Sequence, residues 1–224
     1  MVRLLVYAAI ACLACKLVTG RWPWDFLRPD RSRRQAVIRA QKLLGVRAGA
    51  SHTEIIEAHA ERHPGLSILH FDAHADLYHD FEGNPFSHAS PFARLMESGR
   101  IARLVQVGLR TQTAHLRDQA RRFGVEQHEM HCLPVPRAIA FDGPVYLSFD
   151  LDALDPAFAP GVSHHEPGGL TTREVIAMIH GFRGKLIGAD IVELNPLRDI
   201  NGMTAMVAAK LAKEMAARML ADRG

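Results

Sequence analysis

Hydrophobic residues follow two patterns along most of this chain, and the patterns predict strands and helices in turn. Short apolar runs rich in β-branched and aromatic residues predict buried strands, whereas apolar positions at helical spacing predict helices with one buried face. Strands that alternate with helices predict a three-layer α/β/α fold around a mainly parallel sheet. The expected strands span 66–71, 104–109, 126–130, 145–149 and 186–194, and the expected helices span 53–63, 90–97, 114–123, 172–182 and 203–220.

Acidic residues follow several of the predicted strands at the point where each strand ends. In extended backbone, the side chains of residues two apart point to the same side. The acidic side chains within each group can therefore contact the same ion or ligand. The carboxyl ends of parallel strands are also where functional groups collect in such folds. Glu193 lies at the end of the strand predicted over 186–194, and Thr53 is the expected N-cap of the first helix. The two larger groups are Asp72, His74 and Asp76, and Asp150 and Asp152.

Four carboxylates and one imidazole predict a metal site. Any single aspartate at such a position is more often a helix cap or a surface charge, but two groups at two strand ends favour metal ligation. The set is hard enough for manganese and too rich in carboxylates for structural zinc. Four negative charges suit two divalent ions, which about 3.5–4 Å apart can lower the pKa of a shared water.

The charge of the chain is unevenly distributed. The first 52 residues hold 10 Lys and Arg against 2 Asp and Glu, whereas the rest holds 17 against 22. A basic arm for nucleic acid or membrane is one interpretation. We instead expect 1–52 to be an atypical segment outside the core, and 53–224 to be the α/β domain. A helix is expected over 33–44 within this segment.

Neither the cysteines nor the N-terminal apolar run adds a functional site. Cys12, Cys15 and Cys132 form no disulfide framework and have no zinc-ligand spacing. The apolar run over 4–14 is too short to span a membrane and precedes no clear cleavage site. We therefore expect a cytoplasmic protein, with an N-terminal export signal as the alternative.

Several longer motifs resemble the ureohydrolase family of arginases and agmatinases, and the finer pattern is similar to the plant-type arginase branch. The resemblance runs from about residue 61 to the C-terminus. The motifs are FDAHAD (71–76), FEGNPFSHASPFARLMESG (81–99), SFDLDALDPAFAPG (148–161), APGVSHHEPGGL (159–170), EPGGLTTREV (166–175), GADIVELNP (188–196) and NGMTAMVAAKL (201–211).

The resemblance implies a function and a metal arrangement. Manganese-dependent hydrolysis would release urea from L-arginine, leaving L-ornithine, or from agmatine, leaving putrescine. By the same resemblance, Asp72 and Asp150 would bridge two Mn²⁺ ions. His74 and Asp152 would complete the shell of one ion, and Asp76 would bind the other. The implied partner is a small guanidino substrate, in a homo-oligomer without nucleic acid or membrane.

Three further residues receive roles from the same resemblance. Glu193 would bind the guanidinium group, which a carboxylate suits. His88 would pass a proton to the leaving amine, a role for which imidazole has a suitable pKa. Asn84 would lie near the amino-acid end of the substrate, although its position before a proline is equally typical of a turn.

The chain departs from the family pattern before residue 61. The family carries a Gly-Gly-Asp-His-Ser metal motif, whereas residues 46–54 read VRAGASHTE, with the ligand histidine expected near Gly49. His52 is a candidate for a displaced ligand, but its neighbours favour a helix cap. The early strands of the family are expected to be absent. The alternative function is thus a truncated, catalytically impaired homologue with one weakly held ion and an unpaired strand edge at 66–71 or 186–194.

Overall fold

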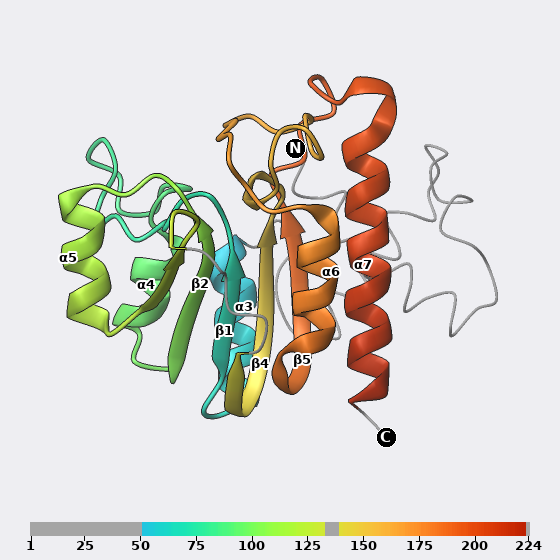
Figure 1. Cartoon of the computed structure of the whole chain (residues 1–224). Helices are drawn as coiled ribbons and strands as arrows, with labels where there is room; N and C mark the ends of the chain where they lie inside the picture. The colour runs from blue at the N-terminus through green and yellow to red at the C-terminus, as the bar shows by residue number, and fades with distance from the viewer. Residues whose placement is uncertain (1–50, 133–138, 223–224) are drawn as a thin grey trace, which may run out of the picture.

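Five parallel strands form the centre of the molecule, in the order β3-β2-β1-β4-β5 (Figure 1). The computed structural model describes residues 51–132 and 139–222, so the apolar run over 4–14, the helix expected over 33–44 and the rest of 1–50 lie outside the described residues. The strands are β1 (Ser67–Phe71), β2 (Arg103–Leu109), β3 (Glu126–Glu129), β4 (Ala140–Asp150) and β5 (Arg183–Val192).

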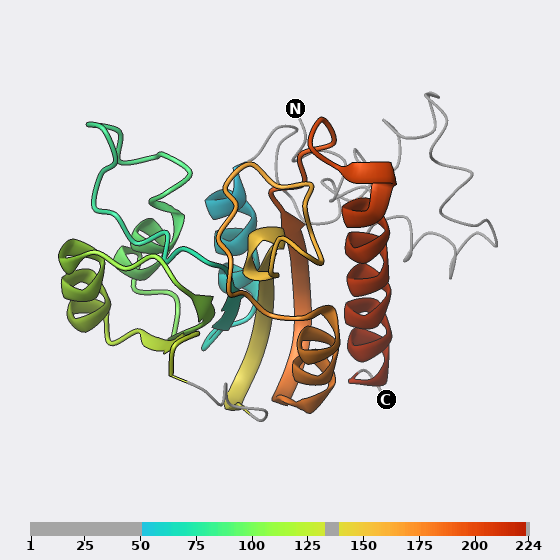
Figure 2. The same cartoon turned by 45° about the horizontal axis from the view of Figure 1, so that its top comes forward.

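Helices cover both faces of the sheet and complete the three layers. One apolar cluster joins α3, α4 and α5 to the sheet, and a second joins α6 and α7 to the opposite face. In Figure 2, α3 lies behind the strands and α6 lies in front, while the red helix α7 stands at the right beside β5. The predicted α/β/α architecture is therefore confirmed. The helices are α3 (His52–Arg62), α4 (Pro91–Glu97), α5 (Ala114–Phe123), α6 (Thr172–Gly181) and α7 (Met203–Ala221), with short 3₁₀ turns at η2 (Leu151–Ala153) and η3 (Ile200–Gly202).

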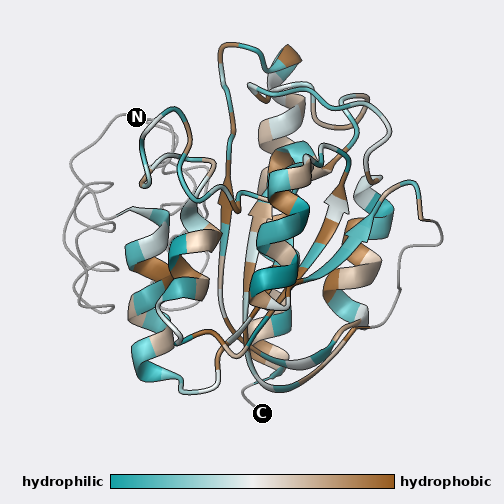
Figure 3. Cartoon of the chain, turned by 90° about the vertical axis from the view of Figure 1, so that its left-hand side faces the viewer, coloured by the Kyte–Doolittle hydropathy of each residue, from teal (hydrophilic) through white to brown (hydrophobic). Residues whose placement is uncertain are grey.

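The sheet interior is apolar, as the strand patterns require. All five residues of β1 are buried, and so are the last six of β4 and of β2. Figure 3 shows the strands carrying hydrophobic residues inside, while the outward faces of the helices are mostly hydrophilic. No helix among residues 51–132 and 139–222 is both long and apolar enough to cross a membrane.

The N-cap of the first described helix lies two residues before the expected one. Ser51, not Thr53, is the N-cap: its hydroxyl accepts the Glu54 N–H at 3.2 Å, and the Glu54 carboxylate accepts the Ser51 N–H at 2.6 Å. This reciprocal capping box satisfies two backbone donors and outcompetes a cap at Thr53. His52 consequently enters the first turn of α3 with only 8% of its surface exposed.

Two strands differ from their predicted bounds, and the difference affects the edges of the sheet. β4 begins at Ala140 because the chain pairs with β5 over 140–144, where Asp142, Gly143 and Pro144 interrupt the apolar pattern that would signal a strand. β5 ends at Val192, so Glu193 lies just beyond it. Among the described strands, β5 and β3 are the edges. The unpaired edge expected at 186–194 is present, whereas β1 lies between two neighbours.

Gly108 is a point where β2 approaches the end of β1 closely. Its φ is 103°, and the pairing of β2 with β3 shifts register between Val107 and Leu109. A Cβ at this position would lie 3.0 Å from the carbonyl oxygen of Asp72. Because that neighbour is backbone, it has no side-chain rotamer with which to move away.

We expect Gly108→Ala to lower the free energy of unfolding by about 2–3 kcal/mol, since it adds both strain at positive φ and a contact with backbone. Gly83→Ala is the matched control, because Gly83 has a φ of 75° but nothing lies within 4 Å of the position that its Cβ would take. It should cost about 1 kcal/mol. Urea denaturation of both variants measures the difference, and equal losses would contradict the close approach.

Candidate metal centre

A cavity of about 360 Å³ opens at the carboxyl ends of β1, β4 and β5. The sheet creates it by pairing β1 with β4 in parallel, with Phe71 opposite Phe149, so that the residues following each strand come together. The cavity is lined by acidic residues, histidines and a polar segment after β2. The lining includes His52, His70, Asp72, His74, Asp76, His88, Thr111, Gln112, Thr113, Asp150, Asp152, His164 and Glu193.

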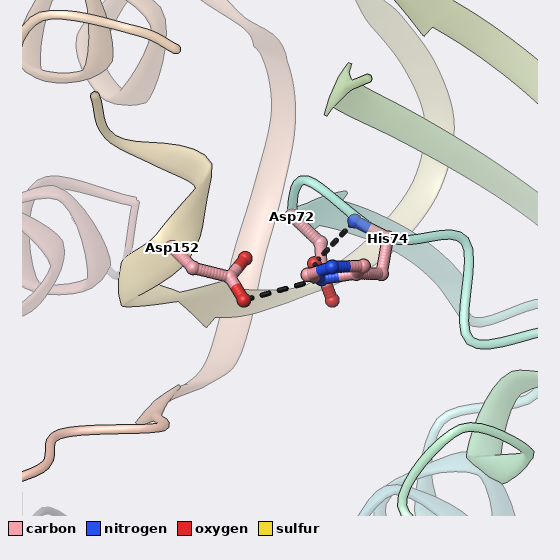
Figure 4. Close-up of side chains that lie close together, drawn as sticks. All are labelled: Asp72, His74 and Asp152. Atoms are coloured by element: carbon pink, nitrogen blue, oxygen red, sulfur yellow. Dashed lines mark hydrogen bonds and ion pairs between the residues drawn. The ribbon is translucent and has the colours of Figure 1, made fainter. Parts of the chain in front are cut away.

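Three of the predicted ligands form a compact group. Asp72 Oδ1 lies 3.2 Å from His74 Nδ1, and Asp152 Oδ2 lies 3.1 Å from the same nitrogen (Figure 4). One ligand atom from each residue lies within 4.8 Å of the others. In the part of the chain that the structure describes, this is the one group of three or more such residues that could enclose an ion.

Backbone N–H groups orient these carboxylates. Asp72 Oδ1 accepts the N–H of His74 at 2.6 Å, and Asp152 Oδ1 accepts the N–H of Ala73 at 3.1 Å. Asp150 Oδ1 accepts the N–H of Asp152 at 2.9 Å, which starts the η2 turn. The ends of β1 and β4 are thus fastened to each other through their own acidic side chains.

The electrostatics of the group favour a positive charge among its carboxylates. Burial raises the pKa of Asp72 and of Asp150 well above the usual range, and the neighbouring Asp152 charge adds to this. Burial alone would lower the pKa of His74. Its hydrogen bonds to Asp152 and Asp72, together with their charges, raise it instead to about 11. The resulting imidazolium lies between two carboxylates and offsets their repulsion.

The donor set fits a hard divalent cation. Carboxylate oxygens with one imidazole are the ligands that manganese accepts, and a cation would replace the charge that the His74 imidazolium supplies. Asp76 and Asp150 line the same cavity but contribute no atom to the compact group. Asp76 is half-buried in a left-handed conformation with a φ of 49°, and burial raises its pKa well above the usual range.

His52 reaches the cavity, although the sequence placed it outside the core. Its Nε2 lies 3.0 Å from Ser148 Oγ and 3.0 Å from Asp190 Oδ2. Asp190 is fully buried and also accepts hydrogen bonds from the hydroxyls of Tyr146 and Ser148. Burial would raise the pKa of Asp190, but the charge and hydrogen bond of His52 outweigh it and lower the value. His52 therefore binds an internal carboxylate on β5.

The three residues expected at the substrate lie in different surroundings. Glu193, directly after β5, lines the cavity with a φ of 64°. His88 also lines it, with its ring stacked 6.1 Å from that of His164. Asn84 does not line it: its side chain accepts the N–H of Phe86 at 2.9 Å, as in a turn. The turn interpretation of Asn84 is the one that its hydrogen bond supports.

Sequence reasoning overlooked several residues of the site. His164 contributes a ring 6.0 Å from that of His74, although it falls within the motif over 159–170. His70 lies two positions before Asp72 on the same side of β1, so the alternation of the strand could have identified it. Arg110 directly follows β2, which is the same strand-end signal that identified the aspartates.

Arg110 and Asp155 fasten the long loop that follows β4. The Arg110 guanidinium donates to the carbonyl oxygens of Gly108, Asp152 and Glu166, at distances between 2.6 and 3.0 Å. Asp155 accepts the N–H groups of Ala157, Gly168 and Gly169 at 2.9, 2.7 and 3.2 Å. Together these bonds place the loop that carries His164 over the cavity.

Comparison with known proteins agrees with this geometry. A model of the arginase family matches residues 51–217. A mitochondrial arginase of Medicago truncatula is 52% identical over 174 residues, which cover 74% of this chain and 52% of that protein. The N(1)-aminopropylagmatine ureohydrolase of Thermus thermophilus is 39% identical over 192 residues, covering 78% of this chain and 64% of that protein. The chain thus spans about half the length of the curated arginase it matches.

Solved structures show the same likeness. The arginase from Medicago truncatula has a TM-score of 0.71 at 49% identity, covering 76% of this chain and 58% of that chain. A triple mutant of a T. brucei arginase-like protein, bound with Mn²⁺, has a TM-score of 0.67 at 32% identity, covering 75% and 57%.

The loop anchored by Asp155 gives a pH-dependent prediction. The N–H of Ala157, and then those of Gly168 and Gly169, hold the pKa of Asp155 below its usual range. Such a carboxylate adds stability above its unfolded-state pKa of about 3.9, and loses it as pH falls through the lower folded-state pKa. Asp155→Asn should therefore cost about 1 kcal/mol at pH 7, because the group is partly exposed.

That cost should shrink as pH falls below about 4, because the carboxylate of the unfolded chain is then protonated and that of the folded chain follows at its lower pKa. Urea denaturation at pH 7 and at pH 3 measures it, with Asp142→Asn on the exposed side of β4 as the control. A cost that stays the same at both pH values would show that the charge of Asp155 plays no part.

Proposed function

The chain belongs to the arginase family, and from this premise we propose that it hydrolyses a guanidino group with manganese and releases urea. The substrate is L-arginine, which yields L-ornithine, or agmatine, which yields putrescine. The observation that carries the proposal is the Asp72–His74–Asp152 group, which shares one cavity with Glu193 and His88.

The proposed metal ligands are the five residues expected from the sequence. Asp72, His74 and Asp152 supply ligand atoms that already converge, and Asp150 adds a carboxylate in the same cavity. Asp76 is the proposed ligand that serves the second ion alone. Bound manganese would supply a water of lowered pKa for attack on the guanidino carbon. The Mn²⁺ in the structure of the T. brucei relative supports this choice of metal.

The other two residues act on the substrate. Glu193 accepts hydrogen bonds from the guanidinium, whose planar set of donors matches a carboxylate, and so fixes the carbon within the cavity. Water adds to that carbon, the bond to the substrate amine breaks, and the amine must gain a proton. His88, at the cavity mouth beside His164, is the proposed donor of that proton.

L-arginine is the favoured substrate of the two. The Medicago truncatula relative is an arginase at 52% identity, whereas the Thermus thermophilus relative acts on an agmatine derivative and is 39% identical. The homo-oligomer, the cytoplasmic location and the absence of nucleic-acid and membrane partners remain predictions of the sequence.

A second candidate is a homologue with the fold but an incomplete metal site. His52 is the observation that favours it, because its Nε2 lies at 3.0 Å from both Ser148 Oγ and Asp190 Oδ2 rather than among the ligand atoms. On this account the ion held by Asp72, His74, Asp150 and Asp152 binds strongly, and the ion at Asp76 binds weakly.

Urea release separates the two candidates. With Mn²⁺ present, we expect urea from L-arginine, and less or none from agmatine, measured by a colorimetric urea assay on the full chain. A sample from which the metal has been removed by chelation is the control. One tightly bound ion per chain without urea from either substrate would exclude the hydrolase and favour the second candidate, whereas two tightly bound ions would exclude the second candidate.

The ligand assignment predicts that Asp150→Asn harms manganese binding more than Asp76→Asn does. Asp150 is proposed to bridge both ions, whereas Asp76 serves one. Because losing an outer partner of a ligand costs about 10–100-fold in affinity, losing a bridging ligand should cost at least about 100-fold. Titration of metal-free protein with Mn²⁺ measures this.

Asp118→Asn on the surface of α5 is the control for a lost carboxylate outside the cavity. Two equally tight sites in the wild type would contradict the weak second site. Equal losses in Asp150→Asn and Asp76→Asn would contradict the bridging role of Asp150.

A further inference from the structure

A row of polar residues crosses the whole sheet at the base of the cavity, which its central member, His70, helps to line. The strand registers place Gln127 beside Gln106, Gln106 beside His70, His70 beside Ser148, and Ser148 beside Asp190. Each of the five strands contributes one member. All but Gln127 are buried, and the row lies two residues before Asp72 and Asp150 on their strands. Buried polar groups in such a row must satisfy one another.

The orientation of the Gln106 amide is fixed by a group that can only accept. Its nitrogen lies 2.6 Å from the carbonyl oxygen of Ala75, so this atom must be the NH₂. Its oxygen accepts the side-chain N–H of Gln127 at 2.9 Å. Both ends of the amide are therefore assigned by their partners.

The second N–H of the Gln106 amide then determines the state of His70. Gln106 Nε2 lies 3.1 Å from His70 Nδ1. Because the amide nitrogen can only donate, Nδ1 must accept this hydrogen bond and therefore carries no proton. A neutral imidazole with a bare Nδ1 bears its proton on Nε2. That nitrogen lies 3.1 Å from Asp72 Oδ2 and donates to it. Phe92 packs on the His70 ring at 3.9 Å between centroids, which keeps the ring in place.

We propose that His70 is a positioning residue for the metal ligand Asp72, and that Gln106 imposes the Nε2–H tautomer with which it acts. The metal part of this inference rests on the proposed function. His70 holds Oδ2 while the backbone of His74 holds Oδ1 at 2.6 Å, so both oxygens of Asp72 have fixed directions. The same Gln106 amide fastens the carbonyl of Ala75, next to Asp76. One buried amide thus orders the backbone and side chains on both sides of His74.

Nitrogen-15 NMR of the metal-free full chain reads the tautomer directly. Long-range correlations between ring protons and nitrogens identify the nitrogen that carries the proton, and loss of the signal in His70→Gln assigns it to His70. We expect Nε2–H in the wild type. Gln106→Glu replaces the donor with a carboxylate and should move the proton to Nδ1.

A wild-type His70 with its proton on Nδ1 would overturn the proposal. So would a Gln106→Glu protein, folded by circular dichroism, in which His70 keeps the Nε2–H tautomer. Neither readout involves urea, so the tautomer and the hydrolase proposal can fail independently.

Manganese affinity tests whether the hydrogen bond positions Asp72. His70→Leu keeps apolar packing against Phe92 but has no donor, whereas His70→Gln places an amide N–H near the position of Nε2. We expect His70→Leu to weaken Mn²⁺ binding by about 10–100-fold and His70→Gln to recover most of it. Isothermal titration of the metal-free proteins with Mn²⁺ gives the affinities.

Gln119→Leu is the matched control, since Gln119 is a buried amide that donates to the Leu77 carbonyl at 3.2 Å without contacting His70. It should leave Mn²⁺ affinity within a factor of about 3, well short of the loss expected for an outer partner of a ligand. Equal losses in His70→Leu and His70→Gln would show that packing, not the hydrogen bond, is what His70 contributes. A loss of Nε2–H on addition of Mn²⁺ would make His70 a ligand and also overturn the proposal.

Discussion

Mutual repulsion among buried carboxylates is the constraint on which the rest of the structure depends. Asp72, Asp150 and Asp152 are 2, 5 and 3% exposed, and the parallel pairing of β1 with β4 brings them to one end of the sheet. Burying several like charges is unfavourable unless N–H donors and a cation accompany them. Each of the three carboxylates accepts a backbone N–H, and the bond to Asp150 also starts the η2 turn. The His74 ring lies between Asp72 and Asp152. Positive charge at the centre of the group, such as that of the His74 ring, therefore stabilises the arrangement.

Two different features of the sheet support this cluster of carboxylates: the apolar packing on its faces and the polar row that crosses its strands. The apolar layers on the two faces, joined to α3, α4 and α5 on one side and to α6 and α7 on the other, fix the strand positions. The polar row through His70 and Ser148 then fixes the directions of the side chains above it. In a buried network every donor requires an acceptor, so one orientation of the Gln106 amide is compatible with its surroundings. Apolar packing alone leaves such directions undetermined, because it is not directional.

The sequence predicted those features that depend on neighbours along the chain. The five strands, the α/β/α layers and the convergence of Asp72, His74 and Asp152 all follow from the alternation of apolar and polar residues and from the direction of parallel strands. It missed features that depend on pairing between distant segments. The bond between His52 and Asp190, and the carbonyls held by Arg110, join segments that no local pattern connects. The start of β4 was missed because Asp142, Gly143 and Pro144 interrupt its apolar pattern, and pairing with β5 continues the strand there.

The part of the cavity around His74 and the part around Asp76 are built from different kinds of contact. The half around His74 is assembled from residues close in sequence or directly opposite in the sheet, so folding of β1 and β4 alone brings its ligand atoms together. The half around Asp76 adjoins α4, where the N–H of Phe92 donates to the Asp76 carbonyl oxygen at 3.2 Å, and His52 of α3 binds Asp190 and Ser148 instead. Asp190 is fully buried, so releasing His52 to a cation would leave that carboxylate without its charged partner. The energy of this internal pair therefore opposes recruitment of His52 as a metal ligand.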